Sequence, residues 1–185
     1  MGSGLWRTRA NALTAVRLVA APVCGLAILE GWAAFALGVF ALAVATDWLD
    51  GRVARHFAET SSLGGTFDHA TDATFVSLGC AALAWHGEVP ALLPALILLA
   101  FAQYVIDSRA EALTSGAPAG WSLRASWLGR WNGIGYFVVV GVPVVRDGAS
   151  IGWPPSVWVH AAGWLLVAST LVSMGDRLWA SRARA

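Results

Sequence analysis

Long apolar segments separated by polar connections are the feature that most limits how this chain can fold. A helix needs about 20 mostly apolar residues to cross a hydrocarbon core roughly 30 Å thick. Six segments of the 185-residue sequence meet or approach this requirement. They cover residues 13–29, 32–50, 67–85, 89–106, 133–145 and 156–174. The sequence therefore predicts an all-α integral membrane protein with six transmembrane helices.

The composition agrees with a membrane protein. Hydrophobic residues make up 57% of the chain and charged residues 12%, about half the charged share of an ordinary soluble domain. A water-soluble fold of this size could not bury so much apolar surface, whereas a bilayer can solvate it. The length suits a single membrane domain over residues 1–185, and the sequence has no basic run that would indicate a nucleic-acid partner.

The arginines predict how the chain is oriented in the membrane. Ten of the twelve lie in residues 1–9, 51–65, 107–130 and 176–185. Of the other two, Arg17 lies inside a predicted helix and Arg146 lies in a connection on the opposite side. Because positively charged connections remain in the cytoplasm, both termini and both long connections are expected there. We expect a multi-pass protein of a bacterial-type inner or cell membrane.

Four aspartates lie at one end of two neighbouring predicted helices. Asp47 and Asp50 are three residues apart, and Asp68 and Asp72 are four apart, so each pair shares one helix face. If the second and third helices pack antiparallel, all four carboxylates converge near the cytoplasmic interface. Carboxylates at membrane depth are costly and are retained mainly for function. We therefore predict an active site at the cytoplasmic end of helices 2 and 3.

Clustered carboxylates at this site predict divalent metal binding. Hard oxygen ligands suit Mg²⁺ or Mn²⁺ rather than zinc. A cluster of this kind can hold two ions, and a metal pair polarises phosphoryl oxygens and stabilises a leaving phosphate. Beside the aspartates, Gly51 and Ala54 leave room for a ligand, and Arg55 could pair with a phosphate.

These residues form the pattern D-x2-D-G-x2-A-R-x8-G-x3-D-x3-D over positions 47 to 72, without a departure. The pattern resembles the signature of the class I CDP-alcohol phosphotransferases, also called CDP-alcohol phosphatidyltransferases. These are integral membrane enzymes of phospholipid synthesis. The segment from Asn11 to Arg17, followed by Pro22, also resembles the start of the family's first helix. The resemblance covers most of the chain.

The resemblance implies a reaction and a role for each matching residue. An alcohol would attack the lipid-side phosphorus of CDP-diacylglycerol and release CMP, in an enzyme that commonly forms homodimers. Asp72 would be the general base that takes the proton of the acceptor hydroxyl. The implied metal ligands are Asp47, Asp50, Asp68 and Asp72. The implied CDP-binding residues are Asp50, Gly51, Ala54, Arg55 and Gly64.

The acceptor alcohol is the part of the reaction that the motif leaves open. Glycerol 3-phosphate is expected because it is the commonest acceptor in the family. Inositol phosphate or another alcohol remains an alternative, since residues 104–111 resemble the inositol-phosphate-using branch whereas residues 128–133 match neither branch. A phosphorylated acceptor needs cationic partners on the cytoplasmic side. The candidates are Arg109, Arg124, Arg130 and Arg17.

A function of another class is a non-catalytic cation-binding membrane protein or transporter. Such a protein would need acidic residues near mid-span in several helices. Here the acids lie at one edge, and the fourth and fifth predicted spans contain none. His69 lies between two of the aspartates but on another helix face, so we predict packing or interfacial hydrogen bonding for it rather than metal binding.

Overall fold

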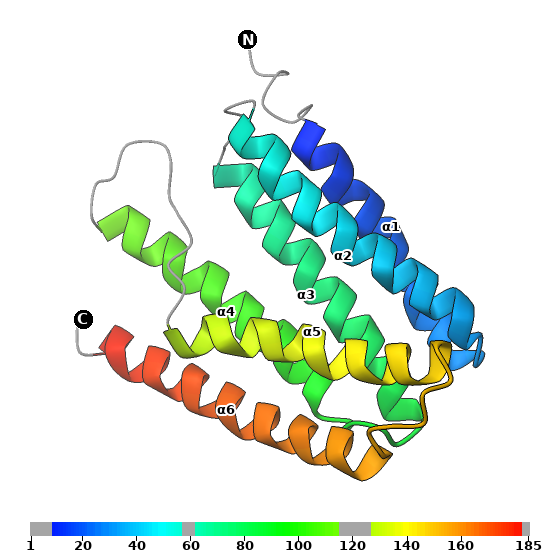
Figure 1. Ribbon diagram of the computed structural model, residues 1–185. Coiled ribbons are helices and arrows are strands. Elements are labelled where there is room, and N and C mark those ends of the chain that lie inside the picture. The colour runs from blue at the N-terminus through cyan, green and yellow to red at the C-terminus, as the bar shows by residue number, and fades with distance from the viewer. Residues whose placement is uncertain (1–8, 57–61, 115–126, 183–185) are drawn as a thin grey trace.

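The computed structural model describes residues 9–56, 62–114 and 127–182, and its regular structure there is entirely α-helical. The described residues form six helices that follow one another in sequence (Figure 1). They are α1 (Arg9–Leu29), α2 (Ala33–His56), α3 (Ser62–Trp85), α4 (Leu93–Thr114), α5 (Trp127–Gly148) and α6 (Ser156–Arg182). Each predicted apolar segment corresponds to one of these helices. The predicted all-α fold is confirmed.

Several helix boundaries differ from those predicted by hydropathy. The start of α4 is Leu93 rather than residue 89, because Pro90 disfavours helical geometry in the residue before it. The end of α2 is His56, six residues beyond the predicted end, so the second helix contains the motif from Asp47 to Arg55. The start of α5 is Trp127 instead of residue 133. Polar helical ends are invisible to a search for apolar runs.

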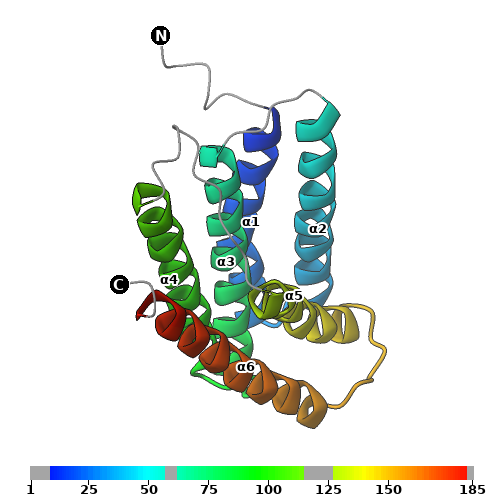
Figure 2. The same cartoon turned by 90° about the vertical axis from the view of Figure 1, so that its left-hand side faces the viewer.

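The helices α1, α2 and α3 lie side by side and form the part of the fold that carries the aspartate motif (Figures 1 and 2). The first residues of α1, the end of α2 and the start of α3 lie at the same end of this group. Helix α5 runs across α2 and α3 at a steep angle, and α6 lies outside the group and is inclined to its helices. In this arrangement α5 packs against α2 and α3, while α6 packs against α4 and α5.

The surface is that of a membrane protein. Large apolar side chains are exposed on all six helices, for example Val19 at 67% and Leu165 at 72%, whereas Thr71 and Thr170 are buried. Among the described residues, three helical stretches are long and apolar enough to cross a bilayer: Ala12–Leu29, Trp127–Gly148 and Ser156–Ala180. A shorter apolar stretch covers Ala33–Leu49. The prediction of six spans goes beyond these three and stays a prediction.

Glycines allow α5 to approach α2 and α3 closely. A Cβ atom on Gly79 of α3 would lie 2.8 Å from Val140 Cγ1 of α5. On Gly148, a Cβ atom would lie 2.6 Å from Leu37 Cβ and 2.8 Å from the Ala33 carbonyl oxygen of α2. Neither spacing accommodates a side chain, so these glycines fix how near the crossing helix comes to the group of α1, α2 and α3.

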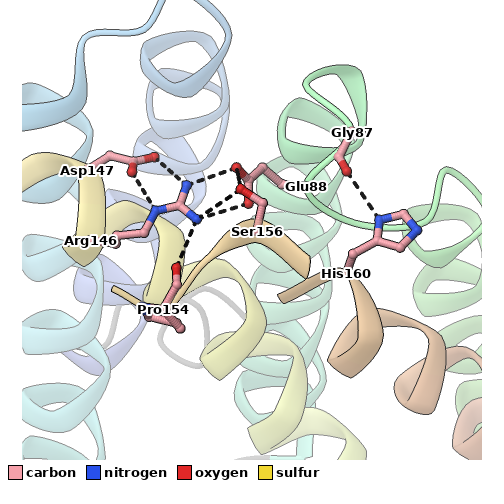
Figure 3. Close-up of polar contacts among 7 residues, drawn as sticks. All are labelled: Gly87, Glu88, Arg146, Asp147, Pro154, Ser156 and His160. Atoms are coloured by element: carbon pink, nitrogen blue, oxygen red, sulfur yellow. Dashed lines mark hydrogen bonds and ion pairs between the residues drawn. The ribbon is translucent and has the colours of Figure 1, made fainter. Parts of the chain in front are cut away.

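Arg146 lies near the end of α3 that is remote from the aspartates. There it contacts the α3–α4 connection and the α5–α6 connection (Figure 3). Its Nη2 lies 2.9 Å from Glu88 Oε1 in the α3–α4 connection, and its Nε lies 2.6 Å from Asp147 Oδ1. It also donates to the Pro154 carbonyl at 3.3 Å, and Ser156 Oγ donates to Glu88 at 2.6 Å. A largely buried guanidinium thus joins the α3–α4 connection to the start of α6.

Candidate active site

Three of the four predicted aspartates converge on the guanidinium of Arg17. This arginine lies on α1, and its side chain is 0% exposed. Its Nη1 lies 2.8 Å from Asp47 Oδ1 of α2, and its Nη2 donates to Asp68 Oδ1 of α3 at 3.1 Å. Nη1 also donates to Asp72 Oδ1. The structure therefore brings Asp47, Asp68 and Asp72 together from two helices, as the helical spacing predicted.

Most of the remaining motif residues were expected in the connection between the second and third helices, but the structure places them within α2 and α3. Asp50, Gly51, Ala54 and Arg55 belong to α2, and their side chains fall outside the part of the chain that the structure describes. Gly64 lies on α3, one turn before Asp68, and is partly buried. The assignment of these residues to CDP binding stays a prediction.

His69 lies nearer to the aspartates than its position on the helix suggested. Its ring stacks on Tyr104 of α4, with centroids 6.2 Å apart, so it makes a packing contact, whereas the expectation that it does not bind metal stays a prediction. Its Nδ1 is also 3.8 Å from Asp68 Oδ2. One ligand atom from each of Asp68, His69 and Asp72 lies within 4.8 Å of the others. The partner ring on α4 could not be foreseen from the sequence around His69.

The donor set fits a divalent cation. Asp47 is about half exposed, and Asp68 and Asp72 are partly exposed, so their oxygens are accessible. Carboxylates that converge from two helices supply the hard oxygen ligands preferred by Mg²⁺ and Mn²⁺. Within the described ranges, Asp68, His69 and Asp72 form a candidate metal site.

A cavity of about 610 Å³ opens beside the aspartates and extends among α3, α4, α5 and α6. Asp47 and Asp72 line it on one side, whereas Val76, Ile97 and Phe137 form an apolar part of its wall. The volume lies within the range of about 300–1,000 Å³ that is usual for small-molecule sites. Asp72 therefore faces a space large enough for a small substrate.

Polar groups of three helices line the same cavity. Gln103 on α4 donates through Nε2 to the Met174 carbonyl at 3.0 Å. Its Oε1 is buried and has no hydrogen-bond partner among the residues that the structure describes. Asn132 on α5 accepts a hydrogen bond from Ser169 Oγ of α6 at 2.6 Å. Buried polar groups of this kind fix the orientation of a polar ligand.

Two arginines give the cavity a positive end. Arg130 on α5 and Arg177 on α6 both line it. The Arg177 Cζ lies 4.9 Å from the centroid of the Tyr104 ring, and Nη1 lies 3.9 Å from Asp107 Oδ2. Guanidinium groups that line a cavity are suited to bind a phosphate or a carboxylate.

Of the four arginines predicted to bind the acceptor, Arg130 lines the cavity and Arg17 contacts the aspartates. Arg109 is exposed on α4, and Arg124 falls outside the described residues. Arg177 was missed, because it was interpreted only as a cytoplasmic positive charge. A signal existed in the sequence: Thr170, Ser173 and Arg177 form a polar stripe at helical spacing on an otherwise apolar helix, and all three line the cavity.

Apolar-surfaced helices with a carboxylate cluster beside a cavity that contains arginines define a helical membrane protein with a candidate metal-dependent site. The chain belongs to the CDP-alcohol phosphatidyltransferase family, whose family model matches residues 7–174. This match confirms the family predicted from the aspartate motif.

The curated relatives of the chain include two kinds of enzyme. The CDP-diacylglycerol–glycerol-3-phosphate 3-phosphatidyltransferase of Escherichia coli K12 is 27% identical over 158 residues, which cover 82% of this chain and 81% of that protein. The CMP-forming cardiolipin synthase of Rattus norvegicus is 40% identical over 89 residues, or 48% of this chain. The human cardiolipin synthase is 39% identical over the same length. The match spans 30% of the length of each cardiolipin synthase. No solved structure matches the chain significantly.

Proposed function

We propose that the protein is a membrane-integral transferase that moves a phosphatidyl group from CDP-diacylglycerol to a small alcohol and releases CMP. The observation that carries this proposal is the convergence of Asp47, Asp68 and Asp72 beside a cavity that Asp47 and Asp72 line. Family membership supports the reaction class, and the names of both groups of relatives describe phospholipid synthesis from CDP-activated or CMP-releasing chemistry.

The donor binds at the aspartate motif in this proposal. Asp47, Asp50, Asp68 and Asp72 would hold two divalent cations, Mg²⁺ or Mn²⁺. Bound there, the ions would supply positive charge for the pyrophosphate of the donor and for CMP as the leaving group. Asp50, Gly51, Ala54, Arg55 and Gly64 form the CDP pocket, with small residues admitting the nucleotide and Arg55 pairing with a phosphate.

Asp72 activates the acceptor. Its carboxylate takes the proton of the acceptor hydroxyl as the oxygen–phosphorus bond to the phosphatidyl group forms and the phosphorus–oxygen bond to CMP breaks. The position of Asp72 on the cavity wall supports this role, because an alcohol in the cavity lies beside the carboxylate. Apolar residues such as Val76 and Phe137 limit water near the reacting phosphorus.

The acceptor is a small phosphorylated polyol, with glycerol 3-phosphate preferred. Arg130 and Arg177 pair with its phosphate, and Gln103 and Asn132 bind its hydroxyl groups. The positive end and the polar wall of the cavity support this choice, as does the name of the Escherichia coli relative. Inositol phosphate has the same chemistry and remains the alternative. Arg17, Arg109 and Arg124 stay predicted contributors.

In the cell, we place the enzyme in a bacterial-type membrane as a single multi-pass domain over residues 1–185. Both termini and the site face the cytoplasm, where the CDP head group of the donor is accessible. The distribution of arginines supports this orientation. We propose a homodimer, in keeping with the family resemblance.

The test is CMP release by the purified protein in detergent with CDP-diacylglycerol, Mg²⁺ and one acceptor at a time. The acceptors are glycerol 3-phosphate, inositol 1-phosphate, inositol, serine and phosphatidylglycerol. Metal-dependent CMP release with glycerol 3-phosphate is expected, and the lipid product identifies the reaction. Metal uptake into liposomes without CMP release from any acceptor would instead favour a cation transporter.

A further inference from the structure

Arg17 is a buried cation whose contacts are carboxylates of the candidate metal site. Its side chain is 0% exposed, although it lies in an apolar helix. A buried guanidinium is stable only where negative groups and hydrogen-bond acceptors compensate its desolvation. Here the compensation comes from Asp47 on α2 and from Asp68 and Asp72 on α3. The arginine therefore joins three helices through the residues proposed to bind metal.

The guanidinium and a divalent cation would bind the same three carboxylates. Nη1 contacts the Oδ1 atoms of Asp47 and Asp72, and Nη2 contacts Oδ1 of Asp68. A hard cation also binds through carboxylate oxygens. Its positive charge would also repel a guanidinium a few ångströms away. Full occupancy of these oxygens by both partners is unfavourable.

The charge of the group still favours a divalent cation. Three carboxylates and one guanidinium leave a net charge of −2. Arg17 thus reduces the repulsion among the aspartates without neutralising them. We propose that Arg17 is a resident counter-cation that holds the aspartates together in the metal-free protein and competes with divalent ions for their oxygens. This inference rests on the metal site of the proposed function.

A second buried arginine in the chain provides a matched control. Arg146 is also largely buried and pairs with carboxylates, those of Glu88 and Asp147, but it lies at the other end of α3 (Figure 3). Replacing either arginine by Met removes a buried ion-pair network and lowers stability. Of the two replacements, only that of Arg17 also removes a competitor of the metal. The two variants therefore separate competition from loss of structure.

The experiment titrates Mn²⁺ into EDTA-treated, purified full-length protein in detergent and detects binding by electron paramagnetic resonance. Thermal melting is recorded with EDTA and with Mg²⁺. Compared with the wild type, Arg17→Met is expected to melt at a lower temperature in EDTA. Its melting temperature should also rise more when Mg²⁺ replaces EDTA. Its dissociation constant for Mn²⁺ should fall by about tenfold, the order expected when a like charge is removed at close range. Arg146→Met should also melt earlier, but with the Mn²⁺ affinity of the wild type.

Arg17→Lys keeps the proposal testable if the Met variant does not fold. An ammonium group keeps the charge but lacks the planar set of donors with which a guanidinium contacts three carboxylates. The melting temperature of this variant should therefore also rise more with Mg²⁺ than that of the wild type. Equal or weaker Mn²⁺ binding in the folded Arg17 variants would overturn the inference. So would a raised KM for the acceptor alone with unchanged Mn²⁺ affinity, which would support acceptor binding by Arg17. If the wild type bound no Mn²⁺, the metal site and this inference would both be wrong.

Discussion

The guanidinium of Arg177 on α6 lies 4.9 Å from the centroid of the Tyr104 ring on α4, and both side chains line the cavity that contains Asp72. The ring holds the arginine by a cation–π interaction. His69 stacks on Tyr104 as well, so one aromatic ring contacts both the metal-binding region and the positive end of the cavity. Tyr104 therefore lies between the region proposed to bind metal and the region proposed to bind the acceptor phosphate.

Arg177 is therefore expected to select a phosphorylated acceptor. Arg177→Gln should raise the KM for glycerol 3-phosphate by about 10- to 100-fold, the range for loss of a hydrogen bond to a charged group. The KM for CDP-diacylglycerol should change little. Steady-state CMP release at varied concentrations of each substrate measures both.

Asp176→Asn is the control for this variant, because Asp176 is an exposed neighbour on the same helix and does not line the cavity. Arg177→Lys should retain part of the selectivity, since a point charge still attracts phosphate. An unchanged KM for glycerol 3-phosphate in Arg177→Gln would remove Arg177 from the acceptor site.

Local patterns in the sequence predicted the six helices and the aspartate cluster. Apolar runs identify helices, and spacings of three and four residues place Asp47 and Asp50, or Asp68 and Asp72, on one face. The carboxylate partners of Arg17 could not be predicted, because they depend on how α1 packs against α2 and α3. The same holds for Arg177 and Tyr104, which lie on different helices and meet only in the folded chain.

Asp72→Asn is expected to abolish turnover while the fold persists. An amide keeps the shape of the side chain but cannot accept the hydroxyl proton, and loss of a general base typically lowers kcat by about 10²–10⁴-fold. CMP release is measured alongside the melting temperature in the presence of Mg²⁺. Asp147→Asn serves as the control, since Asp147 pairs with Arg146 at the other end of α3. Retained CMP release in Asp72→Asn would show that another group is the base.

Glu88 and Asp147 both pair with Arg146 but should contribute unequally to stability. Glu88 is 15% exposed and Asp147 is 51% exposed. Removing the charge of Glu88 leaves a largely buried guanidinium undercompensated, so Glu88→Gln should lower the free energy of unfolding by about 1–3 kcal/mol. Asp147→Asn should lower it by about 0–1 kcal/mol, as is usual for exposed pairs. Thermal melting of both variants in one detergent compares them. Equal losses of stability would contradict the idea that the more buried carboxylate contributes more.

Gly148 is expected to tolerate no side chain, because α5 meets α2 there. In Gly148→Ala the new methyl group would lie 2.8 Å from the Ala33 carbonyl oxygen, a backbone atom that cannot rotate away. Overpacking of this kind costs about 1–3 kcal/mol, so the melting temperature should fall by several degrees. Gly38 on α2 is the matched control: nothing lies within 4 Å of a Cβ atom built there. Gly38→Ala should therefore keep or raise the melting temperature, since alanine is favoured over glycine in a helix by about 1 kcal/mol. If Gly148→Ala were as stable as Gly38→Ala, α5 would not approach α2 as closely as the structure has it, and the cavity wall that α5 forms would lie farther from Asp72.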